Sequence, residues 1–337
     1  MVRIEALAFI MSALWTIGNG ASSVVDILLA MTATLVMAAH LICVNIAAVG
    51  PLACIGLARR ARRTGDGGAN DLARWLALLC NKLLLLGMVL GALQFLIIYW
   101  QGQSEYFDAL GRMPKSRLHW GTAELLFYFV CMLPYALMWQ RLSKRPLLHA
   151  FLAVMAATNL LYHFPPLFII ISQLAYLPNR EVVLDGAGFR AMMVDPAVLS
   201  RVSHHLLAAV AITSAVIMWR AAKRDAVPND EEAAGQEWLP IARVAAWWAL
   251  GATAAQIPSG IWLTLNLAES RRSAVLGDDL PATSLFLCAM AGALMLLHHL
   301  AAVALGETER RSVRKAFWLL VLVLVLMNGV LQRLTDV

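Results

Sequence analysis

The stretch that decides the fold is residues 200–209, which read SRVSHHLLAA and open a long apolar run. The run continues through Thr213 to Trp219, a length that suits a helix crossing a bilayer. Two adjacent histidines, His204 and His205, are costly in hydrocarbon and therefore need partners inside a bundle. This stretch predicts a membrane-spanning helix with a functional site near one end.

The composition indicates that the whole chain lies in a membrane. Hydrophobic residues make up 61% of the chain and charged residues only 14%, whereas a soluble domain carries about 25% charged residues. The 337 residues suffice for about eight spans of roughly 20 residues with short loops. We therefore expect an all-α, polytopic transmembrane helix bundle without a sizeable soluble domain.

Long apolar runs, each bounded by charged residues or by Pro and Gly, mark the expected spans. They cover approximately residues 25–57, 73–100, 119–140, 147–175, 198–220, 239–265, 284–306 and 316–333. Residues 4–17 form a shorter apolar stretch, followed by the turn-rich residues 18–23. We expect residues 1–23 to hold an interfacial or re-entrant helix, with a ninth span as the alternative, and residues 24–337 to form the bundle.

The basic residues indicate the orientation of the chain rather than a nucleic-acid partner. A formal charge of +6 would suggest nucleic-acid binding in a soluble protein, but here the Arg and Lys clusters lie in loops on one side. The clusters are at residues 59–63, 141–145, 220–224 and 310–315. This side is predicted to be the cytoplasmic side of a bacterial inner membrane. The five cysteines lie in apolar runs without a CxxC or CxxCH motif, which argues against disulfides and c-type haem.

Residues that can bind iron gather in the predicted outer half of the bundle. The partner that best suits a bundle-facing imidazole is a haem iron, so this distribution predicts b-type haem. At about 1.5 Å per residue, His298 and His299 lie about two turns deeper than the others. The candidates are His40, His163, His204, His205, Met290, His298 and His299.

Several segments, in consistent order over residues 25–335, resemble subunit I of the cytochrome bd quinol oxidases. Residues 201–209 are similar to that family's R-F-x-H-x-L-L-A-A segment, whose His ligates the low-spin b haem. The span containing His40 resembles the N-terminal helix that carries the His of a second haem. Residues 286–290, FLCAM, fall where the family has F-R-x-M, and residues 122–125, TAEL, are similar to its A-x-E-G segment.

The resemblance implies that His204 and Met290 are the axial ligands of a low-spin haem b and that His40 holds a second haem. His205 points about 100° away from His204 on a helix, so it is a separate ligand, a propionate contact or an interhelical contact. His298 and His299 either ligate a deeper haem or form interhelical hydrogen bonds.

The remaining polar candidates have open interpretations. His163 precedes Phe-Pro-Pro, where we expect a helix break whose freed carbonyls could satisfy the imidazole or else leave it as a ligand. Glu124 is a candidate proton carrier, a residue that faces a haem, or a plain interfacial acid. His149 lies at a cytoplasmic end, where we expect its side chain to reach toward the interface.

The departures from the bd pattern bear on the expected function. The loop between the sixth and seventh spans is short, the family's G-R-Q-P-W motif is missing, and Met327-Asn328-Gly329 stands where the family has a glutamate haem ligand before a glycine. We expect a membrane b-type cytochrome subunit that transfers electrons between the quinone pool and a redox partner.

The expected cofactors are one to three b haems, with a quinone as a further candidate. The expected partners are other membrane subunits of a respiratory complex and a c-type cytochrome. Two alternatives remain open: a terminal quinol oxidase subunit that reduces dioxygen, and a haem-free membrane scaffold or transporter subunit.

Overall fold

The computed structural model describes residues 24–177, 182–224, 233–307 and 309–335, and within these it contains helices and no strands. The expected all-α bundle is therefore confirmed. The predicted helix in residues 1–23 lies outside the described residues. The long helices are α2 (Val24–Thr64), α3 (Gly67–Trp100), α5 (Lys115–Leu137), α7 (Pro146–Ala175), α9 (Pro196–Arg224), α10 (Ala233–Leu265), α12 (Leu280–Leu305) and α13 (Arg310–Arg333).

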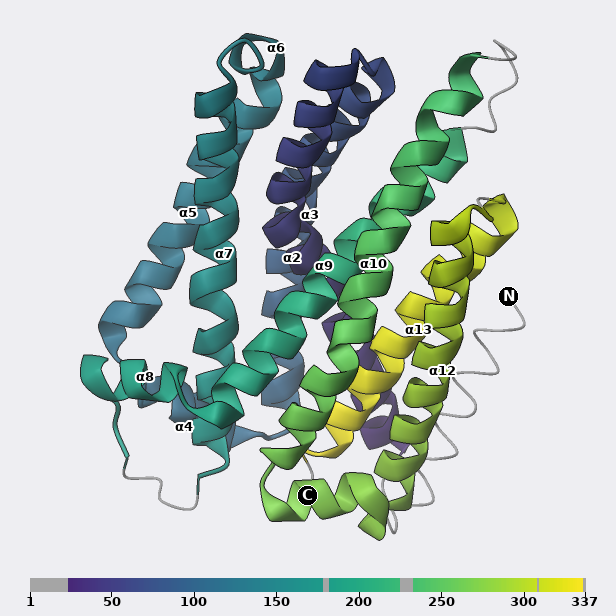
Figure 1. The fold of residues 1–337 in the computed structure, drawn as a ribbon. Helices are drawn as coiled ribbons and strands as arrows, with labels where there is room; N and C mark the ends of the chain where they lie inside the picture. The colour runs from purple at the N-terminus through teal and green to yellow at the C-terminus, as the bar shows by residue number, and fades with distance from the viewer. Residues whose placement is uncertain (1–23, 178–181, 225–232, 308, 336–337) are drawn as a thin grey trace.

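In the described part of the chain, seven helices are long and apolar enough to cross a membrane: α2, α3, α5, α7, α9, α12 and α13. The remaining predicted span, 239–265, lies in α10, which is as long as its neighbours but falls outside this set. Arg243, Gln256 and two prolines lower its mean hydropathy. It still packs along α9 and against α12 in the same bundle (Figure 1).

Short helices occupy several of the loops between the long helices. They are α4 (Ser104–Gly111), α8 (Gly186–Met193) and α11 (Glu269–Ser273), which leads into the π-helix η1 (Ala274–Asp278), together with the single turn α6 (Trp139–Leu142). Figure 1 shows α4, α8 and the C-terminus at the end of the bundle opposite α6. We call these ends the α8 end and the α6 end.

Local sequence explains where several helices begin. Asp66, Asp185 and Asp279 are the N-cap residues of α3, α8 and α12, and each accepts a hydrogen bond from a main-chain N–H three residues later. The basic residues of the 59–63 cluster are helical as well, so α2 extends several residues past the predicted span. Apolarity sets where a helix can lie in the membrane, but the cap decides where the helix itself begins or ends.

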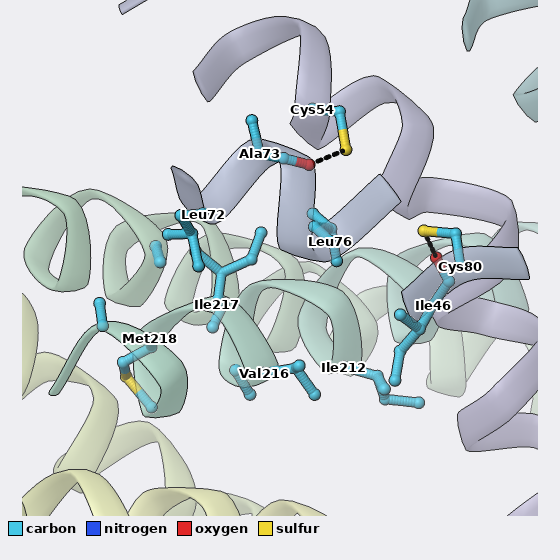
Figure 2. Packing of buried hydrophobic residues seen from close by; sticks show 14 of the residues in the cluster. Ile46, Cys54, Leu72, Ala73, Leu76, Cys80, Ile212, Val216, Ile217 and Met218 are labelled. Carbon is cyan, nitrogen blue, oxygen red and sulfur yellow. Dashed lines mark hydrogen bonds between the residues drawn. The ribbon is translucent and has the colours of Figure 1, made fainter. Parts of the chain in front are cut away.

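The second helix, α2, is the centre of the bundle, because it packs against α3, α7, α9 and α13. Figure 2 shows part of the resulting apolar core, where Leu72 and Leu76 from α3 face Ile212 and Val216 from α9. Buried thiols help to join the helices, since Cys54 Sγ donates to the Ala73 carbonyl at 3.3 Å and Cys80 Sγ to the Ile46 carbonyl at 3.5 Å (Figure 2).

Gly50→Ala is expected to destabilise the protein, because α3 packs directly against α2 at this glycine. An added Cβ would lie 2.3 Å from Cys80 Sγ, and the hydrogen bond to Ile46 holds that thiol in place. Overpacking of this kind costs about 1–3 kcal/mol. Thermal unfolding of the detergent-purified protein measures the loss.

The matched control for this substitution is Gly56→Ala, because nothing lies within 4 Å of a Cβ added at that exposed helical position. Adding Cys80→Ala to Gly50→Ala should recover most of the lost stability, since it removes the overlapping sulfur. Equal losses for the Gly50 and Gly56 variants would contradict the packing account.

Candidate functional site

His40 on α2 is oriented by a hydrogen bond to the neighbouring helix. Its Nδ1 lies 2.8 Å from the main-chain carbonyl oxygen of Gly87 on α3, so Nδ1 donates and the Nε2 lone pair is left available. One turn further along α3, a Cβ added at Gly91 would lie 3.0 Å from His40 Cε1. The glycine therefore makes room for the ring, and the carbonyl fixes the tautomer that a metal ligand needs.

His204 on α9 lies in a similar setting against α10. Its Nδ1 is buried and has no hydrogen-bond partner among the described residues. A Cβ added at Gly260 of α10 would lie 3.5 Å from the ring, and the imidazole also interacts with the main chain of Gln256. A glycine on the adjacent helix again lies against the imidazole of a predicted ligand.

His205 brings the two imidazoles into one region of the bundle. It interacts electrostatically with both His204 and His40, and α9 packs directly on α2. The Thr213 hydroxyl donates to the Asn45 carbonyl at 3.3 Å, which fixes the two helices to each other below the histidines. His205 is thus close enough to interact electrostatically with both predicted ligands.

Met290 is partly buried on α12. The helix α10 packs against both α9 and α12, whereas α9 and α12 are not among the helix pairs that pack closely. Met290 and His204 therefore lie on helices that flank α10. This separation is compatible with a group bound between the two side chains.

The pair His298 and His299 lies toward the α6 end of α12. Their rings meet edge to face at 5.5 Å, the first ring is exposed, and the second interacts electrostatically with Lys315 and Glu307. His298 is seven residues from the end of α12, or about 10 Å. These side chains are therefore separate from His40 and His204.

Glu124 on α5 and His163 on α7 form a close pair. Glu124 Oε2 lies 3.2 Å from His163 Nδ1. Below the pair, the Asn159 amide of α7 donates to the main-chain carbonyl of Glu124 and joins the two helices. The expected helix break after His163 is wrong, because α7 runs unbroken through Pro165 and Pro166. The imidazole is matched by a carboxylate from the adjacent helix instead of by freed carbonyls.

The expectation for His149 is also wrong. Its side chain is buried at the α6 end and stacks on Tyr135, with ring centroids 4.1 Å apart and planes within 8°. Trp139 packs edge-on against both rings and donates to Asn70 of α3 at 3.0 Å. Aromatic packing therefore holds the imidazole inside the bundle.

Comparisons with known proteins bear on the fold. No protein-family model matches the chain, and no curated protein matches it. Among solved structures, it is similar to the bd oxidase from Geobacillus thermodenitrificans, at 16% sequence identity, with a TM-score of 0.69 over 90% of this chain and 84% of that chain. The chain has a divergent bd-oxidase-like fold.

The expected resemblance to the bd oxidases is thus confirmed as a likeness of fold, and the protein is a multi-pass membrane protein. At this identity the likeness does not extend to the residues of the site. His204, Met290 and His40 remain predicted ligands, now with a described environment.

The residues of the bd-like bundle fit a haem better than a bare metal ion. No cluster of three or more His, Cys, Asp or Glu side chains able to hold a metal ion occurs among the described residues. A haem needs no such cluster, because the porphyrin supplies four nitrogens and the protein one or two axial ligands. Within the described part of the chain, His40 Nε2 and His204 Nδ1 have no geometric hydrogen bond, and each ring has a glycine of the neighbouring helix at its side.

Proposed function

We propose that this chain is a membrane-embedded b-type cytochrome subunit that transfers electrons between the quinone pool and a redox partner in a larger respiratory complex. One observation carries the proposal: in a bd-oxidase-like fold, the rings of His40 and His204 each lie beside a glycine of the neighbouring helix and each keep one nitrogen without a geometric hydrogen bond to the described residues.

In this proposal each predicted ligand has a defined role. His204 and Met290 would hold one haem b, and His40 would hold a second. The bound haems supply one-electron redox chemistry. The protein sets the orientation and basicity of the ligands. The Gly87 carbonyl accepts a hydrogen bond from His40 Nδ1–H, which strengthens Nε2 as a ligand.

Asn328 favours electron transfer over oxygen reduction. It stands where the bd pattern has a glutamate haem ligand, and its side chain is a neutral amide that donates to the Leu324 carbonyl of its own helix at 2.8 Å. The amide nitrogen of Asn328 is therefore already hydrogen-bonded within its own helix. The substitution therefore supports a protein with fewer haem sites than a complete oxidase subunit.

The surface supports a membrane subunit with partners. Basic side chains are exposed at the α6 end, which we assign to the cytoplasmic side of a bacterial inner membrane; they include Arg62, Arg63, Arg141, Lys144 and Arg145. Other membrane subunits would contact the exposed apolar faces of the bundle, and a c-type cytochrome would accept or donate electrons at the α8 end.

Anaerobic reduction by quinol tests the proposed function. The purified oxidised protein is mixed with a short-chain quinol, and the b-haem absorption bands are followed with time. We expect quinol to reduce both haems in the wild-type protein, whereas the His204→Ala variant lacks the haem on His204 and should show only the bands of the remaining haem. Haem that dithionite reduces but quinol does not would contradict a role on the quinone pool.

Gly91→Ala is expected to perturb the haem on His40, whereas Gly260→Ala leaves the haem on His204 almost unchanged. A Cβ at Gly91 would lie 3.0 Å from the His40 ring, so the ring must shift by a few tenths of an ångström. A Cβ at Gly260 would make an ordinary contact at 3.5 Å. Midpoint potentials from a redox titration measure the effect of each substitution on its haem. A larger shift in the Gly260 variant would contradict this ranking.

A further inference from the structure

The Glu124–His163 pair lies well inside the membrane-spanning part of the bundle. Glu124 is nine residues after the start of α5, about 14 Å along the helix, and His163 is twelve residues before the end of α7. Ionisable side chains are costly at such depth and usually mark a substrate or proton pathway. The pair therefore calls for a function beyond holding two helices together, a task that Asn159 already performs.

The geometry of the pair leaves polar atoms unused. The 3.2 Å contact between Glu124 Oε2 and His163 Nδ1 is not aligned as a hydrogen bond, and Oε2 is buried without a partner among the described residues. His163 Nε2 is likewise buried without a geometric hydrogen bond there, with only 4% of the side chain exposed, although the imidazole interacts with the main chain of Arg117 and Nε2 would lie 3.5 Å from a Cβ added at Gly121 of α5. Both groups can still bind a third polar group.

Arg117 adds a positive charge to the same face of α5. It lies two turns before Glu124 and interacts electrostatically with both Glu124 and His163. Its guanidinium packs over the Phe189 ring of α8 at 4.8 Å from the centroid. The cation therefore lies on the α8 side of the pair.

The pair can be reached from the membrane rather than from water. About a quarter of the Glu124 side chain, 24%, is exposed. Its surroundings on α5 and α7 are exposed apolar and aromatic side chains that suit lipid contact, among them Leu126 and Tyr162 at 65% each. A ligand that arrives through this face must dissolve in the bilayer and still carry polar atoms on its headgroup.

A row of aromatic rings runs from the pair toward α3. The His163 ring lies 5.4 Å from that of Phe164, Phe164 lies 6.4 Å from Phe168, and Phe168 lies 6.5 Å from Phe95 of α3. Phe95 is one turn after Gly91, and a Cβ added at Gly91 would lie 3.0 Å from the His40 ring. The row therefore ends on α3, one turn from the glycine beside a predicted haem ligand.

We infer that Glu124 and His163 form a membrane-facing site for the headgroup of a quinone or quinol, an inference that rests on the proposed electron-transfer function. The ring oxygens of the headgroup hydrogen-bond to the pair, and the isoprenoid tail stays in the lipid. On oxidation, one quinol gives one quinone, two protons and two electrons. Glu124 would take one proton and His163 the other, and the two b haems of the proposed function, once bound and oxidised, would supply the acceptors for the two electrons.

The test measures binding of a decyl-substituted benzoquinone to the purified full-length protein by equilibrium dialysis in detergent. Glu124→Gln and His163→Gln keep size and polarity but remove the charge and the base. We expect each to weaken binding by about tenfold or more, the loss of one hydrogen bond to a charged group. His149→Gln, at the α6 end, is the matched control and should bind as the wild type does. Unchanged affinity in both site variants overturns the inference.

A photoreactive azidoquinone supplies a second readout that does not depend on a substituted protein. Label in peptides from residues 115–137 or 146–175 supports the site, and label confined to other helices overturns it. Haem content measured on the same samples separates the two proposals. If the protein contains haem that quinol reduces, but quinone binding does not depend on Glu124 and His163, only the site is refuted. Pair-dependent binding in a protein without haem refutes only the proposed function.

Discussion

His204→Ala is expected to remove one b haem from the purified protein, and His40→Ala a different one. The two imidazoles lie on α9 and α2, against α10 and α3 respectively, so each should serve its own haem. An alanine offers no axial ligand, and loss of the iron–nitrogen bond leaves the porphyrin held by packing alone. Pyridine haemochrome quantitation per mole of protein measures the loss, and difference spectra show which species has disappeared.

The matched control for these variants is His298→Ala. That imidazole is exposed toward the α6 end of α12, and its removal should leave the haem content unchanged if the haems lie at His40 and His204. Equal haem content in all three variants would show that these histidines do not hold haem. Loss of both species in a single variant would show that the two sites are not independent.

Arg333→Met is expected to cost about 3–5 kcal/mol of folding stability, the usual effect of breaking a buried ion pair from one side. Arg333 ends α13 and donates through Nη2 to Asp279 Oδ2 at 2.8 Å, and through Nε to both carboxylate oxygens. The arginine side chain is 5% exposed and that of Asp279 15%. Asp279 also caps α12 by accepting from the Ala282 N–H, so the pair joins the ends of two helices.

Thermal unfolding in detergent measures this loss. Methionine keeps most of the volume of the arginine side chain, which separates the lost charge from a cavity. Adding Asp279→Asn to Arg333→Met should restore part of the stability, because the amide can still cap α12 and no longer leaves a charge unpaired. A double variant as unstable as the sum of the single variants would contradict coupling between the two side chains.

The same pair predicts a dependence of stability on acid pH. Burial alone would raise the pKa of Asp279, but hydrogen bonds from Arg333 and the Ala282 N–H outweigh it and hold the pKa below its usual value. A carboxylate of this kind stabilises the fold above its unfolded pKa of about 4 and loses that contribution as the pH falls through the folded pKa. The gap in melting temperature between wild type and Asp279→Asn should therefore narrow below about pH 4. A gap that is constant from neutral to acid pH would contradict the assignment.

Most of the fold could be predicted from the sequence because hydrocarbon imposes one strong rule. Every backbone polar group must be paired within the segment, so long apolar runs must be helices. The same rule does not determine the structure of the loops. There the short helices α4 and α8 form, and local caps such as Asp185 decide where such a helix begins. The helix break expected at Pro165 and Pro166 does not occur, because α7 accommodates both prolines.

The candidate site was predictable residue by residue but not pair by pair. His40 and His204 could be selected because an imidazole in an apolar run is costly wherever it lies. The glycine at 260 and the contact between Glu124 and His163 involve two helices each, and sequence spacing does not determine which faces meet. The side chain of His149 was expected to reach toward the interface, but it is held inside by Tyr135, an aromatic partner from another helix that sequence spacing does not reveal.

The most direct test of the account is the haem content of the purified wild-type protein, from its reduced-minus-oxidised spectrum and pyridine haemochrome. The account predicts two b-type haems per chain, with bands that appear on reduction. A protein that shows a thermal unfolding transition, and is therefore folded, but has no Soret band would contradict the account. The chain would then be a haem-free membrane subunit.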